Sequence, residues 1–334
     1  MSTSRTSVAT RRRLPDPGDG ALSLFPDRPT FSNFPATRYQ GSKLKLLEWL
    51  WLNLRELQFD TVLDAFGGTG CVSYLFKCQG KEVTYNDLLR ANHVVGTALI
   101  ENPGVRLEDA TISALFTRDP GRDYDDFVER TFAGVFYLSE ENRWIDMVAQ
   151  NVARLPGPFI RETALFCLFQ ACLAKRPYNL FHRANLYMRT ADVQRSFGNK
   201  ATWEKPFEAH FREAAREANA AVFDNGRVNR SLCSDAKAAP AGLDLVYIDP
   251  PYMNARGVGV DYLDFYHFLV GLTEYEQWPT RITRDYKHLP YRRHDNPWSD
   301  RTRIRTAFDQ LFARFSSSIL AVSYRDNGIP SPDD

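Results

Sequence analysis

The fold class of the chain is indicated most clearly by the stretch Thr61-Val62-Leu63-Asp64-Ala65-Phe66-Gly67-Gly68-Thr69-Gly70. Its first half is a short, mostly apolar run, which is typical of a buried strand, and its second half is rich in glycine. Glycine accepts a positive φ and lets a ligand come close to the backbone. A helix is expected from about residue 71 to residue 77. The stretch therefore predicts a strand, a tight turn and a helix of an α/β fold.

A second strand is expected over residues 82–86, and it ends at Asp87. Asp87 follows Gly68 by about 20 residues, which is the spacing of a carboxylate that binds ribose hydroxyls. Residues 68–73 nearly match the dinucleotide fingerprint, with Ser73 in place of its last glycine. We therefore expect a cofactor that contains a nucleoside. Two ordinary strand–helix units with an incidental aspartate have the same pattern.

The stretch Asp244-Leu245-Val246-Tyr247-Ile248-Asp249-Pro250-Pro251-Tyr252 joins a short apolar strand to a rigid polar end. Proline has a restricted φ and no backbone N–H, so the strand ends there and leaves the carbonyls of Asp249 and Pro250 free to accept hydrogen bonds. A carboxylate, a fixed carbonyl and an aromatic ring suit a planar ligand with an amino group, such as a nucleobase. An ordinary turn after a strand has a similar sequence.

Two further polar positions are expected near the same crevice. A strand over residues 228–233 precedes Asp235, and ligands of open α/β sheets bind at the carboxyl ends of strands. The turn Gly41-Ser42-Lys43 precedes a helix, and helix N-terminal amides beside a lysine suit a carboxylate or a phosphate. An ordinary serine cap beside an exposed lysine is the alternative.

The composition indicates a soluble, globular protein. The chain has 334 residues, a formal net charge of +1 and five cysteines, none of which forms a CxxC pair. No apolar run approaches the roughly 18 residues of a membrane span. We expect a cytoplasmic protein with reduced thiols and no metal site, in which local patches bind any polyanion. Residues 1–33 are expected to form a flexible arm, although their start also has the composition of a transit peptide.

Residues 106–224 lack clear buried strands and are expected to be mostly helical. Between residues 175 and 205 there are seven Lys or Arg residues and two acidic residues, with aromatic residues among them. Cations contact phosphates, whereas aromatic and Asn side chains contact bases. A solvated basic face over an aromatic core has the same composition. The candidate DNA contacts are Lys175, Arg176, Tyr178, Asn179, His182, Arg183, Asn185, Arg189, Arg195 and Lys200.

A second basic segment covers residues 281–305, with eight Lys or Arg residues and three acidic residues. It is a second candidate phosphate-binding surface. Arg292 and Arg293 of this segment, and Arg256 in the loop after Tyr252, complete the candidate DNA contacts.

Five motifs resemble, in the same order, those of Dam-type (class alpha) DNA adenine-N6 methyltransferases. They are Tyr39-Gln40-Gly41-Ser42-Lys43, the segment 64–70, Asn86-Asp87, Ser234-Asp235 and Asp249-Pro250-Pro251-Tyr252. The resemblance covers about residues 34–324. It implies an α/β, Rossmann-like S-adenosylmethionine-dependent methyltransferase sheet with an inserted, mostly helical target-recognition domain. The catalytic domain would comprise residues 34–105 and 225–334, and the insert residues 106–224.

The resemblance also implies a role for each motif. S-adenosyl-L-methionine would be the methyl donor, with Lys43 near its carboxylate, Asp87 at its ribose hydroxyls and Asp235 at its adenine amino group. The implied cofactor contacts are Tyr39, Gly41, Lys43, Asp64, Phe66, Gly67, Gly68, Gly70, Asp87 and Asp235. In the catalytic corner of Asp249, Pro250, Pro251 and Tyr252, the carboxylate and the Pro250 carbonyl would hold the target amine. Tyr252 would stack on an adenine extruded from double-stranded DNA.

Other functions stay open at this stage. The same corner can bind cytosine N4, RNA or a protein amide, and a non-catalytic DNA-binding subunit can keep the fold. A nicotinamide oxidoreductase leaves the motif from Asp249 to Tyr252 unexplained. The family implies a restriction-modification or phage-defence role in the cytoplasm of a bacterial, archaeal or phage host cell.

The expected last strand, residues 318–324, lies close to the end of the chain. Only ten residues follow Tyr324, whereas the family fold continues with a helix and an antiparallel pair of strands. Unless the sequence is trimmed, we expect a second chain or self-association to cover this edge strand.

Overall fold

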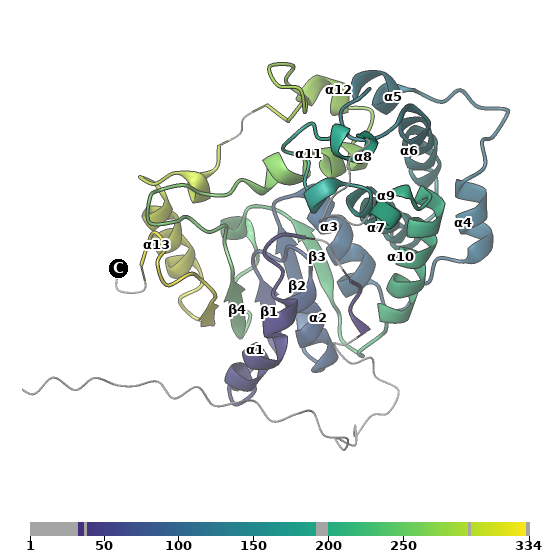
Figure 1. The fold of residues 1–334 in the computed structure, drawn as a ribbon. Coiled ribbons are helices and arrows are strands. Elements are labelled where there is room, and N and C mark those ends of the chain that lie inside the picture. The colour runs from purple at the N-terminus through teal and green to yellow at the C-terminus, as the bar shows by residue number, and fades with distance from the viewer. Residues whose placement is uncertain (1–32, 37–38, 192–199, 293–294, 332–334) are drawn as a thin grey trace, which may run out of the picture.

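The computed structural model describes residues 33–36, 39–191, 200–292 and 295–331. Figure 1 shows a parallel sheet with helices on its faces and, beside it, a group of helices formed mainly by the middle of the chain. The flexible arm predicted for residues 1–33 lies almost entirely outside the described residues.

Within the described residues, one parallel sheet has the strand order β3-β2-β1-β4-β5. Its strands are β1 (Thr61–Asp64), β2 (Glu82–Asp87), β3 (Arg230–Cys233), β4 (Leu245–Ile248) and β5 (Ile319–Val322). The register places Leu63 between Thr84 of β2 and Val246 of β4. The strand order reverses between β1 and β4, and open α/β sheets bind ligands at such a switch point. The predicted α/β, Rossmann-like fold is confirmed.

Side chains alternate between the two faces of the sheet, as the pleat of a strand requires. Val62 and Leu245 pack in a core with α1 (Leu47–Leu54), α2 (Cys71–Cys78) and α3 (Arg90–Gly96). Leu63 and Val246 pack in a second core with α13 (Ile304–Arg314). Because both faces are covered, the central strands are continuous apolar runs.

The middle of the chain folds into helices that pack around α7 (Pro158–Ala174). This helix is apolar on nearly all sides, with Phe166 and Leu168 fully buried, as expected for the centre of a helical layer. It packs against α6 (Ser139–Val152) and α10 (Phe207–Ala221). The neighbouring described helices are α4 (Asp109–Leu115), α5 (Phe127–Thr131), α8 (Tyr187–Thr190) and α9 (Lys200–Glu204). Throughout the described segments, no helix is long and apolar enough to cross a membrane.

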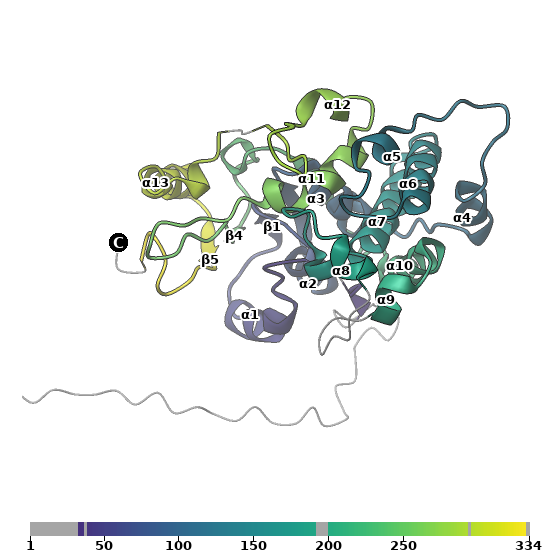
Figure 2. The same cartoon turned by 45° about the horizontal axis from the view of Figure 1, so that its top comes forward.

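Two helices that follow the Asp249 motif join this helical group, as Figure 2 shows. α11 (Tyr262–Thr273) contacts α3 and α7, and its Phe268 stacks on Phe181 with ring centroids 4.9 Å apart. Trp278 of α12 (Trp278–Arg281) is fully buried, and its ring centroid lies 5.1 Å from that of Phe132. The helical group therefore includes residues from the second predicted catalytic segment. The domain boundaries themselves stay a prediction.

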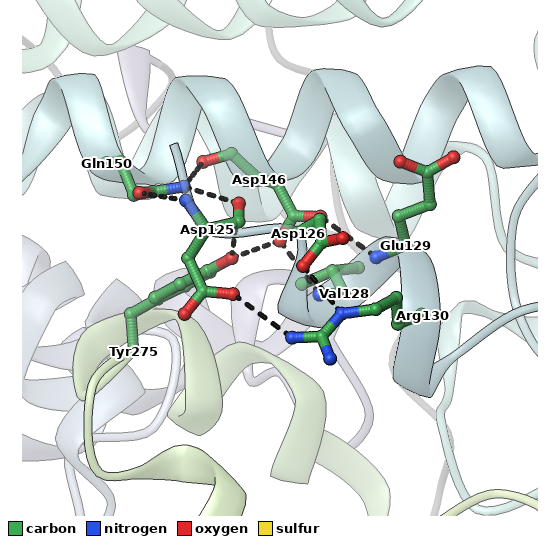
Figure 3. A network of polar contacts seen from close by, with 8 residues as sticks. All are labelled: Asp125, Asp126, Val128, Glu129, Arg130, Asp146, Gln150 and Tyr275. Atoms are coloured by element: carbon green, nitrogen blue, oxygen red, sulfur yellow. Dashed lines mark hydrogen bonds and ion pairs between the residues drawn. The ribbon is translucent and has the colours of Figure 1, made fainter. Parts of the chain in front are cut away.

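The buried carboxylate of Asp146 in α6 ties these parts together (Figure 3). It accepts hydrogen bonds from the backbone amides of Val128 (2.8 Å) and Glu129 (2.9 Å) in α5 and from the Tyr275 hydroxyl. Burial raises the pKa of Asp146 to about 6. Because Tyr275 lies between α11 and α12, the network joins the segment after the Asp249 motif to α5 and α6 of the helical group.

β5 forms one edge of the described sheet, and its residues are half-buried or exposed. Val322 keeps 46% of its surface exposed. Partner coverage of this edge stays a prediction. Short 3-10 helices lie at Leu44–Leu46, Pro177–Asn179, Ala236–Ala238 and Pro297–Ser299, and a π-helix, Thr97–Glu101, continues α3.

Candidate active site

The turn between β1 and α2 is shaped by glycines. Gly68 and Gly70 have φ angles of +52° and +76°, which favour glycine. A Cβ at Gly67 would lie 2.0 Å from the Tyr85 ring. The Tyr85 hydroxyl lies within hydrogen-bond distance of the carbonyls of Gly68 (2.8 Å) and Asn92 (3.0 Å), between which its single proton is shared, so the hydroxyl end of the ring is anchored. The turn therefore requires glycine for its own fold.

Asp87 at the end of β2 holds the same turn. Its carboxylate accepts hydrogen bonds from the backbone amides of Gly68 (2.9 Å) and Leu89 (2.8 Å). Burial raises the pKa of Asp87, and these amides partly offset the rise. Each oxygen keeps a lone pair for a ligand.

Asp64 at the end of β1 is almost completely buried. One of its oxygens accepts a hydrogen bond from the Ser73 hydroxyl at 2.7 Å, and the other has no partner among the described residues. Burial raises the pKa of Asp64 to about 7. An unpaired buried acceptor is costly, so this oxygen suits a ligand that carries a donor or a positive charge.

Asp249 directly follows β4, and its carboxylate is held from two sides. The Lys43 ammonium forms an ion pair with one oxygen, and the Tyr252 hydroxyl donates to the other at 2.7 Å. Burial raises the pKa of Asp249, and Lys43 partly offsets the rise. The corner therefore combines an acceptor, a cation and an aromatic ring.

One cavity brings the two predicted halves of the site together. It is lined by Gly67 and Gly68 of the turn after β1 and by Asp249 and Pro251 of the motif after β4. The other predicted residues in its wall are Tyr39, Gly41, Lys43, Asp64, Phe66, Asp87 and Asp235. Gly70, Pro250 and Tyr252 adjoin these residues in the chain and are not part of the wall. A ligand here can contact the glycine turn and the Asp249 carboxylate at once.

The cavity also contains aromatic residues that the sequence motifs missed. Tyr39 stacks on Tyr266 of α11, with ring centroids 4.2 Å apart, and on Tyr262, at 5.8 Å. The Asn92 amide donates to the Tyr39 hydroxyl at 3.0 Å. Trp298 packs edge-on against Phe66 at 5.0 Å. The aromatic run over residues 262–268 is the sequence signal for α11. It does not indicate that this helix faces the cavity.

Three of the predicted DNA contacts, Lys175, Arg176 and Asn185, are buried in the helical group, and the side chain of a fourth, Arg189, is only 7% exposed, which corrects their interpretation as surface residues. Lys175 and Arg189 each form an ion pair with Glu141 at 2.7 Å. The Arg176 guanidinium donates to the carbonyls of Leu180 and Arg183, and burial lowers its pKa to about 10. Asn185 is also buried. Their polar groups form internal contacts that hold the segment 175–190 in place, and a role for them in DNA contact stays a prediction.

The other predicted DNA contacts in the described chain are wholly or partly exposed. Tyr178 is 65% exposed, and Tyr178 and Asn179 both have positive φ angles, which are strained for residues other than glycine. His182 and Arg292 line a second hollow that shares Asp261 and Asn296 with the first cavity. Arg183, Lys200 and Arg256 are exposed. Arg195 and Arg293 lie outside the described residues.

A parallel sheet with a glycine turn after β1, a carboxylate after β2 and an Asp-Pro-Pro-Tyr corner after β4 defines the class of Rossmann-like methyltransferases. Comparison with known proteins names the family within this class. The family described as D12 class N6 adenine-specific DNA methyltransferase matches residues 39–269. Because the match covers more than half of the chain, the protein belongs to this family, and the resemblance seen in the sequence is confirmed.

Curated relatives agree with this assignment. The Type II methyltransferase M2.HphI of Haemophilus parahaemolyticus is 29% identical over 243 residues, which cover 71% of this chain and 70% of that protein. The Type II methyltransferase M.NlaIII of Neisseria lactamica is 25% identical, covering 88% of this chain and 84% of that protein. The modification methylase StsI of Streptococcus sanguinis is 24% identical, covering 89% of this chain and 45% of that protein. The chain is thus an adenine-specific DNA methyltransferase.

Proposed function

We propose that the chain methylates N6 of one adenine within a specific double-stranded DNA sequence and uses S-adenosyl-L-methionine as methyl donor. The observation that carries the proposal is the single cavity lined by both Gly67–Gly68 and Asp249–Pro251. Methyl transfer requires donor and acceptor to be aligned within one space, and such alignment supplies much of the rate. The relatives' names favour a restriction-modification or phage-defence setting.

The residues of the cavity fit this cofactor. Gly67 has no room for a side chain, and Gly68 holds its positive φ, so a ligand can lie against the bare backbone. The unpaired oxygen of Asp64 suits an ammonium group, and the Asp87 carboxylate suits a ribose diol. Asp235 lies in the same wall and suits an adenine amino group. When bound, the sulfonium compound supplies an electrophilic methyl group.

The catalytic corner is suited to an aromatic amine. The amine of adenine is a poor nucleophile because its lone pair is delocalised into the ring. The Asp249 carboxylate and the Pro250 carbonyl accept hydrogen bonds from its two N–H groups. This arrangement favours a pyramidal nitrogen with an available lone pair. Asp249 is then positioned to accept the proton that nitrogen loses. Tyr252 provides an aromatic face for the extruded base, which compensates for the stacking lost from the duplex.

The exposed predicted contacts suggest where DNA binds. Tyr178 and Arg183 lie on the helical group, and Arg292 lines the hollow that adjoins the active-site cavity. An exposed aromatic residue on a strained turn can stack on bases, and the arginines can contact phosphates. The proposed surface does not include Lys175, Arg176, Asn185 and Arg189, whose polar groups make internal contacts.

Substitution of Asp249 tests the chemistry. We expect Asp249→Ala to abolish methyl transfer from tritiated S-adenosylmethionine to DNA while calorimetry still shows cofactor binding. Asp309→Ala, an exposed position on α13, is the matched control and should keep full activity. Mass spectrometry of digested DNA should show N6-methyldeoxyadenosine. N4-methyldeoxycytidine alone, or full activity of Asp249→Ala, would contradict the proposal.

A further inference from the structure

Lys43 lies beside the carboxylate of Asp249, a position that its sequence neighbours do not predict. The residue is only 9% exposed, and a buried ammonium group requires partners. It forms the ion pair with Asp249, in which the two side chains are 11% and 15% exposed. The Gly41 carbonyl lies 3.5 Å from the same ammonium nitrogen. Lys43 was expected beside the cofactor carboxylate, yet here it contacts the catalytic acceptor.

The contacts of this ammonium match those that the proposed function assigns to the target amine. Its nitrogen donates to the Asp249 carboxylate and lies 5.0 Å from the centroid of the Tyr252 ring. Adenine, bound with its amino group at Asp249 and its ring on Tyr252, would make the same pair of contacts. The ammonium and the amine cannot occupy one place at the same time.

We propose that Lys43 is an internal substitute for the target amino group, occupying the acceptor position of Asp249 until an extruded adenine displaces it. This inference rests on the proposed function. Lys43 is a positioning residue, because it acts on the reaction through Asp249. Its long, flexible stem allows the ammonium to move toward the Gly41 carbonyl without a change in the backbone.

The surroundings of Asp249 explain why an internal cation is useful there. Burial disfavours the charged carboxylate, and the Asp64 carboxylate faces it within the same cavity. The Lys43 ammonium opposes these effects by lowering the pKa of Asp249 and so favours the ionised carboxylate, which can accept N–H donors at both oxygens. The phenols that also interact with Asp249 are Tyr247, Tyr252 and Tyr262.

The test compares wild-type protein with Lys43→Met, which removes the charge and keeps most of the stem. The DNA probe keeps adenine at the target position and carries 2-aminopurine as its neighbour in the strand, whose fluorescence rises when the target adenine leaves the stack. At a pH on the alkaline plateau of activity, loss of the competitor should raise the ratio of extruded to stacked base by about tenfold. The acidic limb of the kcat/KM–pH profile, which reports the free enzyme, should also move to higher pH, because Asp249 loses its counter-ion.

Two further variants provide controls. Lys45→Met removes a charge from an exposed lysine two residues away and should change neither readout. Lys43→Arg keeps the charge and can pair with both carboxylate oxygens, so it should lower the extruded fraction. This opposite sign tests the inference even if Lys43→Met fails to fold, which thermal melting would show.

The outcomes separate this inference from the proposed function. The role of Lys43 would be overturned by a folded Lys43→Met protein whose ratio of extruded to stacked base and whose acidic limb of the pH profile both equal those of wild type. An increased ratio of extruded base in Lys43→Arg would overturn it as well. If wild-type protein produces no N6-methyldeoxyadenosine, the proposed function fails instead.

Discussion

The turn after β1 shows how single residues set the properties of the site. Asp64 is buried with one oxygen bonded to Ser73 and one without a partner among the described residues. Gly67 lies directly against the Tyr85 ring, whose hydroxyl is anchored at the carbonyls of Gly68 and Asn92, so glycine is required there by packing. The unpaired oxygen of Asp64, in contrast, is unfavourable for folding alone, which is common where a ligand must fit.

Replacement of Asp64 should reveal the cost of its burial. The pKa of Asp64 is raised from 3.8 to about 7, so its contribution to stability is present below about pH 4 and is lost as pH rises to about 7. Asp64→Asn cannot ionise and keeps an oxygen for Ser73. Relative to wild type, we expect its free energy of unfolding in urea to be higher at pH 8 than at pH 5, by up to about 3 kcal/mol. Asp309→Asn should show no such difference.

Gly67→Ala should damage both folding and cofactor binding. The new methyl group would overlap the fixed Tyr85 ring, so we expect unfolding free energy to fall by about 1–3 kcal/mol. Calorimetry should also show weaker cofactor binding, because the turn must shift. Gly121→Ala, on an exposed turn where φ is not positive, is the control. A Gly67 variant that matches this control in both measurements would show that the turn is not tightly packed.

At the scale of elements, the helix that follows the catalytic motif determines how the site meets the helical group. α11 packs on α7 through Phe268 and Phe181, and it presents Tyr266 to Tyr39 of the cavity wall. The turn after α11 is then fixed to α6 by the hydrogen bond between Tyr275 and Asp146. One element therefore supports the cavity on one side and the insert on the other.

Tyr275→Phe tests this connection. The substitution keeps the ring and removes one hydrogen bond to a buried carboxylate, so the free energy of unfolding should fall by about 1–3 kcal/mol. Tyr286→Phe, at a tyrosine that is 53% exposed, should change it by less than about 0.5 kcal/mol. Urea denaturation at pH 7 measures both. Equal stabilities of the two variants would mean that the network does not couple α6 to the turn.

At the scale of the whole molecule, the distribution of charge matters more than its total. The formal net charge is only +1, and several cations of the basic segment are enclosed by the helical group. The proposed DNA surface therefore rests on exposed cations such as Arg183 and Arg292, and Arg292 lines the hollow that adjoins the active-site cavity.

The salt dependence of DNA binding should separate exposed from buried arginines. Each phosphate contact contributes roughly 0.9 to the slope of log K against log salt, so Arg292→Ala and Arg183→Ala should each reduce the slope by about that amount. Arg176→Ala should leave the slope unchanged in the folded fraction and lower thermal stability, because its guanidinium bonds Leu180 and Arg183 internally. The opposite pattern would show that Arg176 reaches the DNA.

Local sequence patterns were sufficient to predict the fold and much of the candidate active site. The strand–turn–helix at residues 61–78, the acids after β2 and β4 and the order of the motifs depend on turn chemistry and apolar periodicity, which act over a few residues. The mostly helical structure expected for residues 106–224 likewise holds for the described part of that segment. These features follow from the sequence because each is set by neighbours in the chain.

Tertiary structure alone decided which residues meet across long separations. Lys43 pairs with Asp249, 206 residues away, and Tyr39 packs on an α11 residue that no local pattern connects to it. The same holds for Lys175 and Arg176, whose composition suggested a surface while packing placed them inside. Burial of a charge depends on whether a distant partner such as Glu141 is present, and that information is absent from any local segment.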